Sequence, residues 1–384
     1  MKTNLTVNSN PALSFSRPVL RRAALVLGIA LSAASVHAQT YTLVPINPPA
    51  GSVGRTVAGM NNHGAVVGAT TVKSGKNTVA GPAYVWVAGN AAALTTPLSA
   101  AGAANDISDT GLIVGRTGGS PTRAVWWQAA AGGGYATGDW NLLLPAGSPL
   151  FLHEAMAVSA DGQFVVFDGS NSITDLWGAV VARVEPAGMT IWTIPTIGDP
   201  PVNLRDSLAF DIHFDGTTVR VSGAYTPEGT SHNYAFRWEL NNLTGSTVMT
   251  DLDNNPNRAT NANSVNGSGL AAGYAFFPYT AYVWNGSSAG QQLPTLGGAT
   301  NVAHSINDSG YVVGWSARSG RNATNHAFIW RSVTGTRDLN ALKSSSDTSG
   351  LELTTAYRIN ASGQILARGV TKTTSANVLL TPAP

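Results

Sequence analysis

The chain has 384 residues, with 22 Lys and Arg, 20 Asp and Glu, and no Cys. The absence of cysteine excludes disulfides, thiol catalysis and thiolate metal sites, so stability has to come from apolar burial. Charged residues make up only 11% of the chain, against roughly 25% in average soluble domains. No run of like charge points to a membrane surface, and no basic cluster points to nucleic-acid binding.

The first 38 residues have the pattern of a secretory signal peptide. Their only charges are four basic residues, an apolar stretch follows over 23–34, and Val36-His37-Ala38 indicates cleavage before Gln39. The leader's four basic residues reduce the basic count from 22 to 18, so the mature chain is slightly acidic. We predict a signal peptide at 1–38, a single repeat domain at 39–384, secretion or a periplasmic location, and no membrane span after cleavage.

Seven repeats make up the mature chain, each with a turn glycine followed by an Ala-x-x-x element. The turn glycines, spaced 41 to 54 residues apart, are Gly64, Gly111, Gly162, Gly216, Gly269, Gly310 and Gly363. The elements begin at Ala83, Ala124, Ala179, Ala235, Ala281, Ala327 and Ala376. Their fourth residue is Trp in five repeats, Ala182 in the third and Leu379 in the seventh. Such a period indicates a repeat architecture.

The sixth repeat shows the expected strands most clearly. Residues 307–310 (NDSG) predict a turn, and strands are expected over 311–313, 327–330 and 336–339. A glycine four residues after the turn, Gly314 here, indicates close approach of another backbone. Because the strands have few polar residues, we expect each four-stranded antiparallel sheet to be covered on both faces.

The ends of the repeat array predict a closed ring. The seventh repeat stops at Leu380-Thr381, after its third strand, and residues 41–44 at the mature N-terminus form a lone outer strand. Pairing these segments would remove exposed sheet edges. We predict an all-β fold, a seven-bladed β-propeller of four-stranded antiparallel blades closed by the mature N-terminal strand. A different blade count and an open solenoid are the alternatives.

These motifs resemble those of the bacterial extracellular HAF-repeat proteins. The tripeptide His326-Ala327-Phe328 is accompanied by the lead-in at 296–298, the turn at 306–310 and the strand at 312–314. The match is strong in repeats five and six, fair in one, two and seven, and poor in three and four. The resemblance implies export and a repetitive β-fold, and it carries over no catalytic residue.

No motif for catalysis or metal binding stands out. The sequence contains no HExxH, no Gly-x-Ser-x-Gly elbow, no phosphate loop and no zinc-type spacing. Residues 251–255 lack the glycine and the final glutamate of a calcium loop. His326 belongs to the repeat motif, which favours a structural role. We predict no metal, no cofactor and no enzymatic activity.

The loops that precede the third strands vary in length and share a face with the inter-blade connections. Loop variation on one face is typical of a binding surface in repeat proteins. Candidates for ligand binding, all expected near the starts of inner strands, are Arg55, His153, Glu154, Arg205, Asp206, Arg258 and His304. Ordinary surface polarity is the alternative explanation for them. Trp140 and Trp315, which lie outside the repeated Trp position, could add aromatic contacts.

The sequence therefore predicts a secreted, monomeric binding or scaffold module for an unknown glycan or protein ligand, without nucleic-acid binding. Two alternatives remain at this point. One is a secreted polysaccharide hydrolase or lyase, which needs converging carboxylates at the channel mouth. The other is a structural component of the envelope, which predicts self-association. Fold alone does not decide among them.

Overall fold

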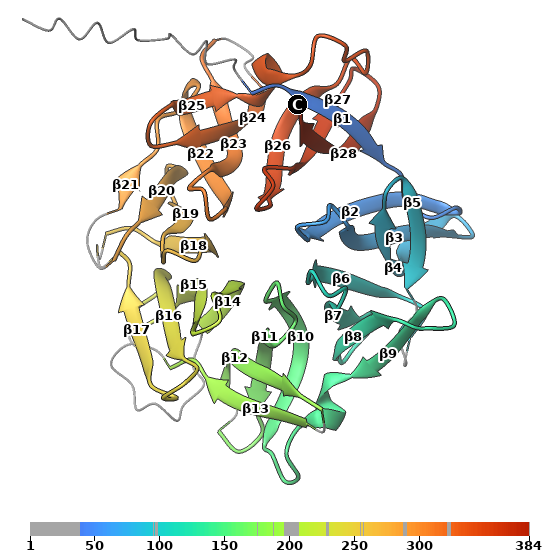
Figure 1. Ribbon diagram of the computed structural model, residues 1–384, viewed down its shortest axis with the longest axis vertical. Helices are drawn as coiled ribbons and strands as arrows, with labels where there is room; N and C mark the ends of the chain where they lie inside the picture. Colours follow the sequence, from blue (N-terminus) through green and yellow to red (C-terminus); the bar gives the residue numbers. More distant parts are fainter. Residues whose placement is uncertain are drawn as a thin grey trace, which may run out of the picture. The chain divides into compact units, whose positions relative to one another are not determined.

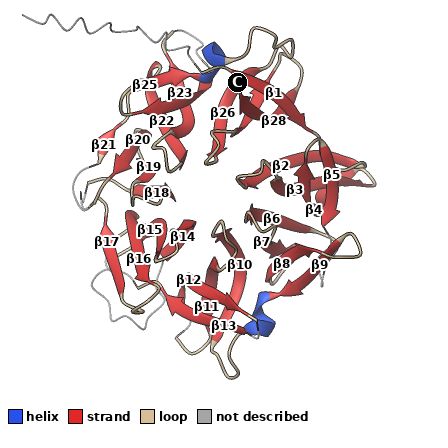
Figure 2. Cartoon of the chain, in the orientation of Figure 1, coloured by secondary structure: helices blue, strands red, loops and turns tan. Residues whose placement is uncertain are grey.

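The computed structural model describes residues 39–94, 96, 99–174, 176–186, 188–195, 207–227, 230–253, 255, 257–286, 290–320 and 324–383. The expected signal peptide at 1–38 and the candidates Arg205 and Asp206 lie outside this part of the chain. The described residues of the unit 39–384 form seven four-stranded antiparallel sheets arranged as a ring (Figures 1 and 2). The predicted seven-bladed β-propeller is confirmed.

Each blade has four strands, numbered here from the channel outward. The innermost strands are β2 (Ser52–Met60), β6 (Gly102–Ile107), β10 (Leu150–Val158), β14 (Ser207–Phe214), β18 (Thr260–Val265), β22 (Gly297–Ile306) and β26 (Glu352–Ile359). The second strands are β3 (Val66–Ser74), β7 (Ile113–Thr117), β11 (Phe164–Asn171), β15 (Thr218–Tyr225), β19 (Ala271–Ala275), β23 (Val312–Arg318) and β27 (Ile365–Val370). The third strands are β4 (Asn77–Val87), β8 (Ala124–Ala129), β12 (Leu176–Glu185), β16 (Tyr234–Asn241), β20 (Thr280–Trp284), β24 (Asn325–Arg331) and β28 (Ser375–Pro382).

The outer strands are shorter in most blades. They are β5 (Asn90–Leu94), β9 (Tyr135–Asp139), β13 (Gly188–Thr193), β17 (Thr247–Asp251), β21 (Gln291–Gln292), β25 (Gly335–Asp338) and β1 (Tyr41–Ile46). Two single-turn 3₁₀ helices, η1 (Trp140–Leu143) and η2 (Leu339–Leu342), follow the outer strands of blades two and six. Asp139 and Asp338 cap these helices by accepting hydrogen bonds from backbone N–H groups.

The core lies between the blades. Each of the seven interfaces between neighbouring blades contains its own cluster of buried apolar side chains. The repeated Trp packs against the preceding blade in each case where it is present; Trp127, for example, is fully buried against blade one. The sequence period therefore reflects an interface that recurs once per blade.

The two repeats without the Trp fill this position differently. In blade three, Ala182 leaves space at an interface that also holds Trp140, which contacts Phe167 edge-on at 5.5 Å between ring centroids. In blade seven, the register aligns Leu380, and not Leu379 as predicted, with the Trp of other blades, because Leu380 pairs with Ile365. Trp140 is thus a core residue and not an exposed aromatic of the loops.

A β-bulge in every innermost strand explains the strand glycines. The second strand approaches the innermost one so closely that a Cβ on Gly314 would lie 1.9 Å from the Val302 carbonyl oxygen. Gly223, displaced in the sequence of repeat four, pairs next to the same bulge. Blades three and seven have Phe167 and Ala367 instead, and both contain a second bulge a few residues earlier.

The ring is closed as predicted. Strand β1 pairs antiparallel with β28 over six residue pairs, from Tyr41 with Pro382 to Ile46 with Asn377. We call this pairing the seam. Blade seven also bonds directly to blade one, since the Asn360 amide donates to the Asn61 carbonyl at 3.0 Å. Chain ends that are far apart in sequence therefore share one sheet (Figure 1).

The asparagine of the repeat motif links neighbouring blades. Its amide NH₂ donates to the carbonyl of the equivalent residue in the next blade, at 3.0 Å from Asn266 to Asn307, from Asn307 to Asn360, and from Asn61 to Ser108. The amide oxygen meanwhile accepts hydrogen bonds from its own turn. Repeats two to four have Ser or Asp at this position.

Candidate functional site: the cavity at the channel mouth

The bulges of the innermost strands build a cavity at one end of the channel. Each bulge turns one extra residue toward the channel, and all seven of these residues line a cavity of about 620 Å³. They are Ala58, Asn105, Met156, Phe210, Asn263, His304 and Tyr357. We call this the mouth cavity. It opens on the face that carries the loops between second and third strands, which we call the loop face.

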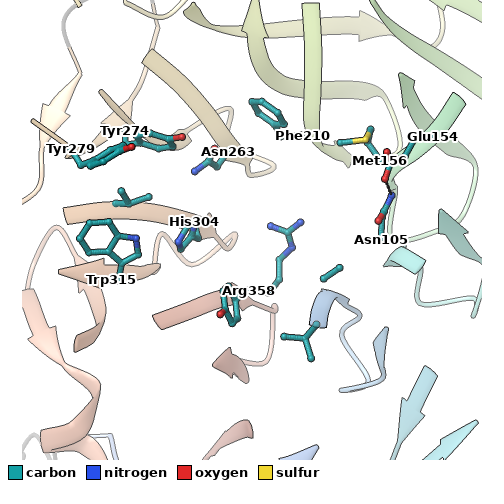
Figure 3. A pocket seen from close by; sticks show the side chains of 14 residues that line it. Asn105, Glu154, Met156, Phe210, Asn263, Tyr274, Tyr279, His304, Trp315 and Arg358 are labelled. Atoms are coloured by element: carbon teal, nitrogen blue, oxygen red, sulfur yellow. Dashed lines mark hydrogen bonds between the residues drawn. The ribbon is translucent and has the colours of Figure 1, made fainter. Parts of the chain in front are cut away.

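One wall of the mouth cavity is aromatic. Tyr274 of β19, Tyr279 of the following loop and Trp315 of β23 lie together on one side (Figure 3). Tyr279 contacts Trp315 edge-on, with 6.3 Å between ring centroids, and lies 5.8 Å from Tyr274. Phe210 continues the apolar lining from blade four. Such a wall suits apolar or planar groups of a ligand.

The opposite side is polar and acidic (Figure 3). Glu154 accepts hydrogen bonds from Asn105 Nδ2 at 2.7 Å and from Arg116 Nε at 3.1 Å. Across the sheet it pairs with Asp168, whose pKa rises to about 6 because of burial and the nearby Glu154 charge. The Glu154 carboxylate is thereby held in one orientation at the edge of the cavity.

Two nitrogen-containing side chains occupy the cavity floor. Burial and the neighbouring Arg358 charge lower the pKa of His304 to about 4, so its imidazole is neutral near pH 7. Arg358 extends into the middle of the channel (Figure 3) and lines cavities at both ends of it. The floor therefore has one cation and one neutral ring.

The structure brings together only some of the predicted residues. Glu154 and His304 line the mouth cavity. Arg55 lies in a separate cleft between blades one and two, and Arg258 pairs with Asp253 and covers the Tyr282 ring. His153 lies at the other bulge of β10, between Leu152 and Glu154. Its ring stacks on Trp177, with 4.2 Å between ring centroids, and is hydrogen-bonded to Ser170 at 2.9 Å.

The bulge residues other than His304 were missed because no motif marks them. A signal does exist, since in six repeats the bulge residue lies three positions before the Asn or Ser of the turn. His304 precedes Asn307 in this way, and Tyr357 precedes Asn360. Repeat four has a longer interval between Phe210 and its turn. The type of residue at the bulge differs among the repeats, as expected for a side chain that faces a channel.

The far end of the channel has a different character. Its cavity, of about 630 Å³, is lined by Asp106 and Asp211. Asp106 accepts a hydrogen bond from the Val158 N–H at 3.0 Å, and Asp211 accepts from Ser264 and the Val265 N–H at 2.7 and 3.1 Å. Both carboxylates thus tie an innermost strand to that of the next blade.

Asp106 makes stability depend on pH. Burial raises its pKa from 3.8 to about 7, although Arg358 opposes the rise. Between these two pKa values the folded protein keeps a proton on Asp106 that the unfolded chain releases. The free energy of unfolding is therefore unaffected by Asp106 below pH 4, and it falls as the pH rises toward 7. We expect Asp106→Asn to raise the free energy of unfolding at pH 8 by roughly 2–4 kcal/mol, and to leave it nearly unchanged at pH 4. Urea unfolding at both pH values measures this, and equal pH dependence in both proteins would refute it.

The described residues contain no assembled catalytic triad or metal cluster. No serine, histidine and carboxylate in this part of the chain are hydrogen-bonded in series, and Ser170–His153 has no carboxylate partner. No group of three His, Asp or Glu side chains there is placed to hold a metal ion. His326, by contrast, bridges Asp338 at 2.6 Å and Glu352 at 2.8 Å, and so links blades six and seven. Among the described helices, none is long and apolar enough to cross a membrane.

The fold defines the class of protein, a β-propeller, here closed and seven-bladed, and solved structures with propeller domains resemble it. One is the β-propeller domain of the trilobed protease from Pyrococcus furiosus, with 10% identity and a TM-score of 0.52, covering 86% of this chain and 95% of that one. Another is the acylaminoacyl peptidase of Pyrococcus horikoshii, with 10% identity and a TM-score of 0.50. A third is an acylaminoacyl peptidase bound to Z-Gly-Gly-Phe-chloromethyl ketone, with 12% identity and a TM-score of 0.50.

The coverage of these relatives is uneven. This chain matches 86% of its length to each acylaminoacyl peptidase but spans only 52% of theirs. At such identities the likeness shows the shared fold and transfers no residue. The Pyrococcus furiosus propeller is described as having an open velcro topology, whereas β1 closes the ring here. No family model and no curated protein matches the chain, so the resemblance to HAF-repeat proteins stays a prediction.

The comparison corrects the predicted function. The prediction of a binding or scaffold module for a glycan or protein ligand is wrong, because the similar solved structures named above are propellers of peptidases.

Proposed function

We propose that this chain is the peptide-receiving propeller of a peptidase. The mouth cavity takes up part of a peptide chain, and cleavage takes place at a catalytic domain outside the propeller. The fold shared with peptidase propellers supports this assignment, as does the lack of an assembled triad in the described residues. One of the similar peptidases binds a Gly-Gly-Phe derivative, which has the chemistry of a short peptide.

The observation that carries the proposal is the combination of groups around the mouth cavity. A peptide needs partners for its backbone N–H and C=O groups and apolar contact for its side chains. Asn263 Nδ2 donates to the Ala303 carbonyl at 2.8 Å, and Asn105 Nδ2 donates to Glu154. The amide oxygens of these two residues accept no hydrogen bond within the described residues, and can accept from peptide N–H groups. The Trp315 wall supplies the apolar contact.

Export by the leader forms part of the proposal. The seam strand β1 begins at Tyr41, so removal of residues 1–38 would leave all seven described sheets complete. A propeller exported in this way would meet peptides outside the cytoplasm.

Peptide binding to the purified full-length protein tests the proposed function. We expect hexapeptides to bind and to be recovered intact by mass spectrometry, and soluble polysaccharides not to bind. Trp315→Ala should weaken binding by about tenfold, the usual effect of removing one aromatic contact from a buried site. Isothermal titration calorimetry measures both affinities.

Trp177→Ala is the matched control for this measurement. Trp177 is 49% exposed and stacks on His153 away from the mouth cavity. Its loss should leave peptide affinity unchanged. Binding of polysaccharide but not peptide, or equal affinity in wild type and Trp315→Ala, would contradict the proposed function.

A further inference from the structure

Arg358 is a cation without a partner inside the channel. It follows the bulge residue Tyr357 directly, and its guanidinium extends into the cavity (Figure 3). Within the described residues it makes no hydrogen bond and no ion pair. Two arginines of second strands do pair, Arg116 with Glu154 and Arg220 with Asp215.

The nearest acidic residues do not neutralise Arg358 by direct contact. Asp106 and Asp211 each use one carboxylate oxygen, Oδ2, to accept hydrogen bonds from the next blade, and neither forms an ion pair with the guanidinium. His304 adds no second positive charge, because burial keeps it neutral. The channel thus presents a single guanidinium with free N–H donors.

The surroundings of this cation select the kind of anion. The aromatic wall of Tyr279 and Trp315 suits an apolar or aromatic side chain beside the anionic group. The fixed Glu154 carboxylate on the other side repels groups with several negative charges. A single carboxylate, which binds a guanidinium through two parallel hydrogen bonds, matches one cation better than a phosphate does.

We propose that the mouth cavity binds the C-terminal end of a peptide, with the α-carboxylate on Arg358 and the terminal side chain against Trp315 and Tyr279. This inference rests on the proposed function and adds a substrate class to it, namely peptides with a free carboxyl terminus and an apolar or aromatic last residue. A peptide reaching the cavity from the loop face would then place its upstream residues toward the surface.

The experiment compares one hexapeptide ending in phenylalanine in three forms: free acid, C-terminal amide and N-acetylated free acid. Calorimetry with the wild-type full chain should show the free acid binding about 10–100-fold more tightly than the amide, the range expected for a charged hydrogen-bonded pair. N-acetylation should have no effect. Arg358→Met should remove the preference for the acid.

The matched control is Arg368→Met, which removes an exposed arginine from the same blade and should keep the preference. If Arg358→Met does not fold by circular dichroism, Arg358→Lys keeps the charge but loses the paired geometry, and should reduce the preference. Equal binding of acid and amide by the wild type would overturn the inference while the proposed function stands. Absence of binding by every peptide would overturn both.

Discussion

Deletion of residues 1–46 is expected to lower the free energy of unfolding by more than about 5 kcal/mol, because it removes the seam strand. Tyr41 and Ile46 are 3% and 0% exposed, and loss of each large buried side chain costs roughly 2–5 kcal/mol. The deletion also leaves β28 as an unpaired sheet edge, which favours aggregation. Thermal unfolding and size-exclusion chromatography measure the two effects.

Deletion of residues 1–38 is the control for this prediction. It stops before β1 and should leave the melting temperature within about a degree of the full-length value, since it removes no described strand. If the two deletion variants unfold at the same temperature, the pairing of β1 with β28 does not stabilise the propeller, and this prediction is wrong.

Gly314→Ala is expected to destabilise the protein by about 3–5 kcal/mol, a large effect for one methyl group. The added Cβ would lie 1.9 Å from the Val302 carbonyl oxygen, so the innermost strand of blade six would have to move. That movement would displace the bulge at His304 and with it the lining of the mouth cavity. Urea unfolding gives the stability, and peptide titration should show weaker binding in the folded fraction.

Gly132→Ala provides the comparison at a position where a Cβ meets nothing within 4 Å. It should change stability by less than about 0.5 kcal/mol. Blade seven shows how a side chain can be accommodated at the position of the strand glycine. Ala367 occupies that position there, and the innermost strand has a second bulge between Leu353 and Thr355. Wild-type stability of Gly314→Ala would mean that the innermost strand can adjust without such a bulge.

The sequence was sufficient for the architecture because the fold repeats one interface seven times. Turn glycines, strand glycines and the Trp of the third strand recur where their contacts recur, so the blade count and the seam could be predicted. Leu379 was aligned one residue too early, because blade seven has Asn377 at the third-strand position where other blades have Ala. Trp140 was expected in a loop because its helix follows the outer strand of blade two.

The site was less predictable, because its residues lie where the repeat is free to vary. Glu154 and His304 were selected because the sequence was expected to place them near the starts of innermost strands, but Glu154 lies in the middle of β10 and His304 near the end of β22. Arg55 and Arg258 were selected for the same reason and face other contacts. A bulge inserts one residue and so reverses which side chains of the strand face the channel. The alternation of polar and apolar residues in the sequence does not reveal where the bulge lies. Arg358 was overlooked for this reason, since it directly follows a bulge.

Photo-crosslinking tests most directly the claim that a peptide enters the mouth cavity. A hexapeptide with a photoreactive phenylalanine analogue at its free C-terminus would be irradiated with the full-length protein, and labelled residues mapped by mass spectrometry. The account predicts labels on Trp315, Tyr279 or Tyr357, competed by the unlabelled peptide. Labels confined to the far end of the channel, around Asp106 and Asp211, or scattered over the outer strands, would contradict it.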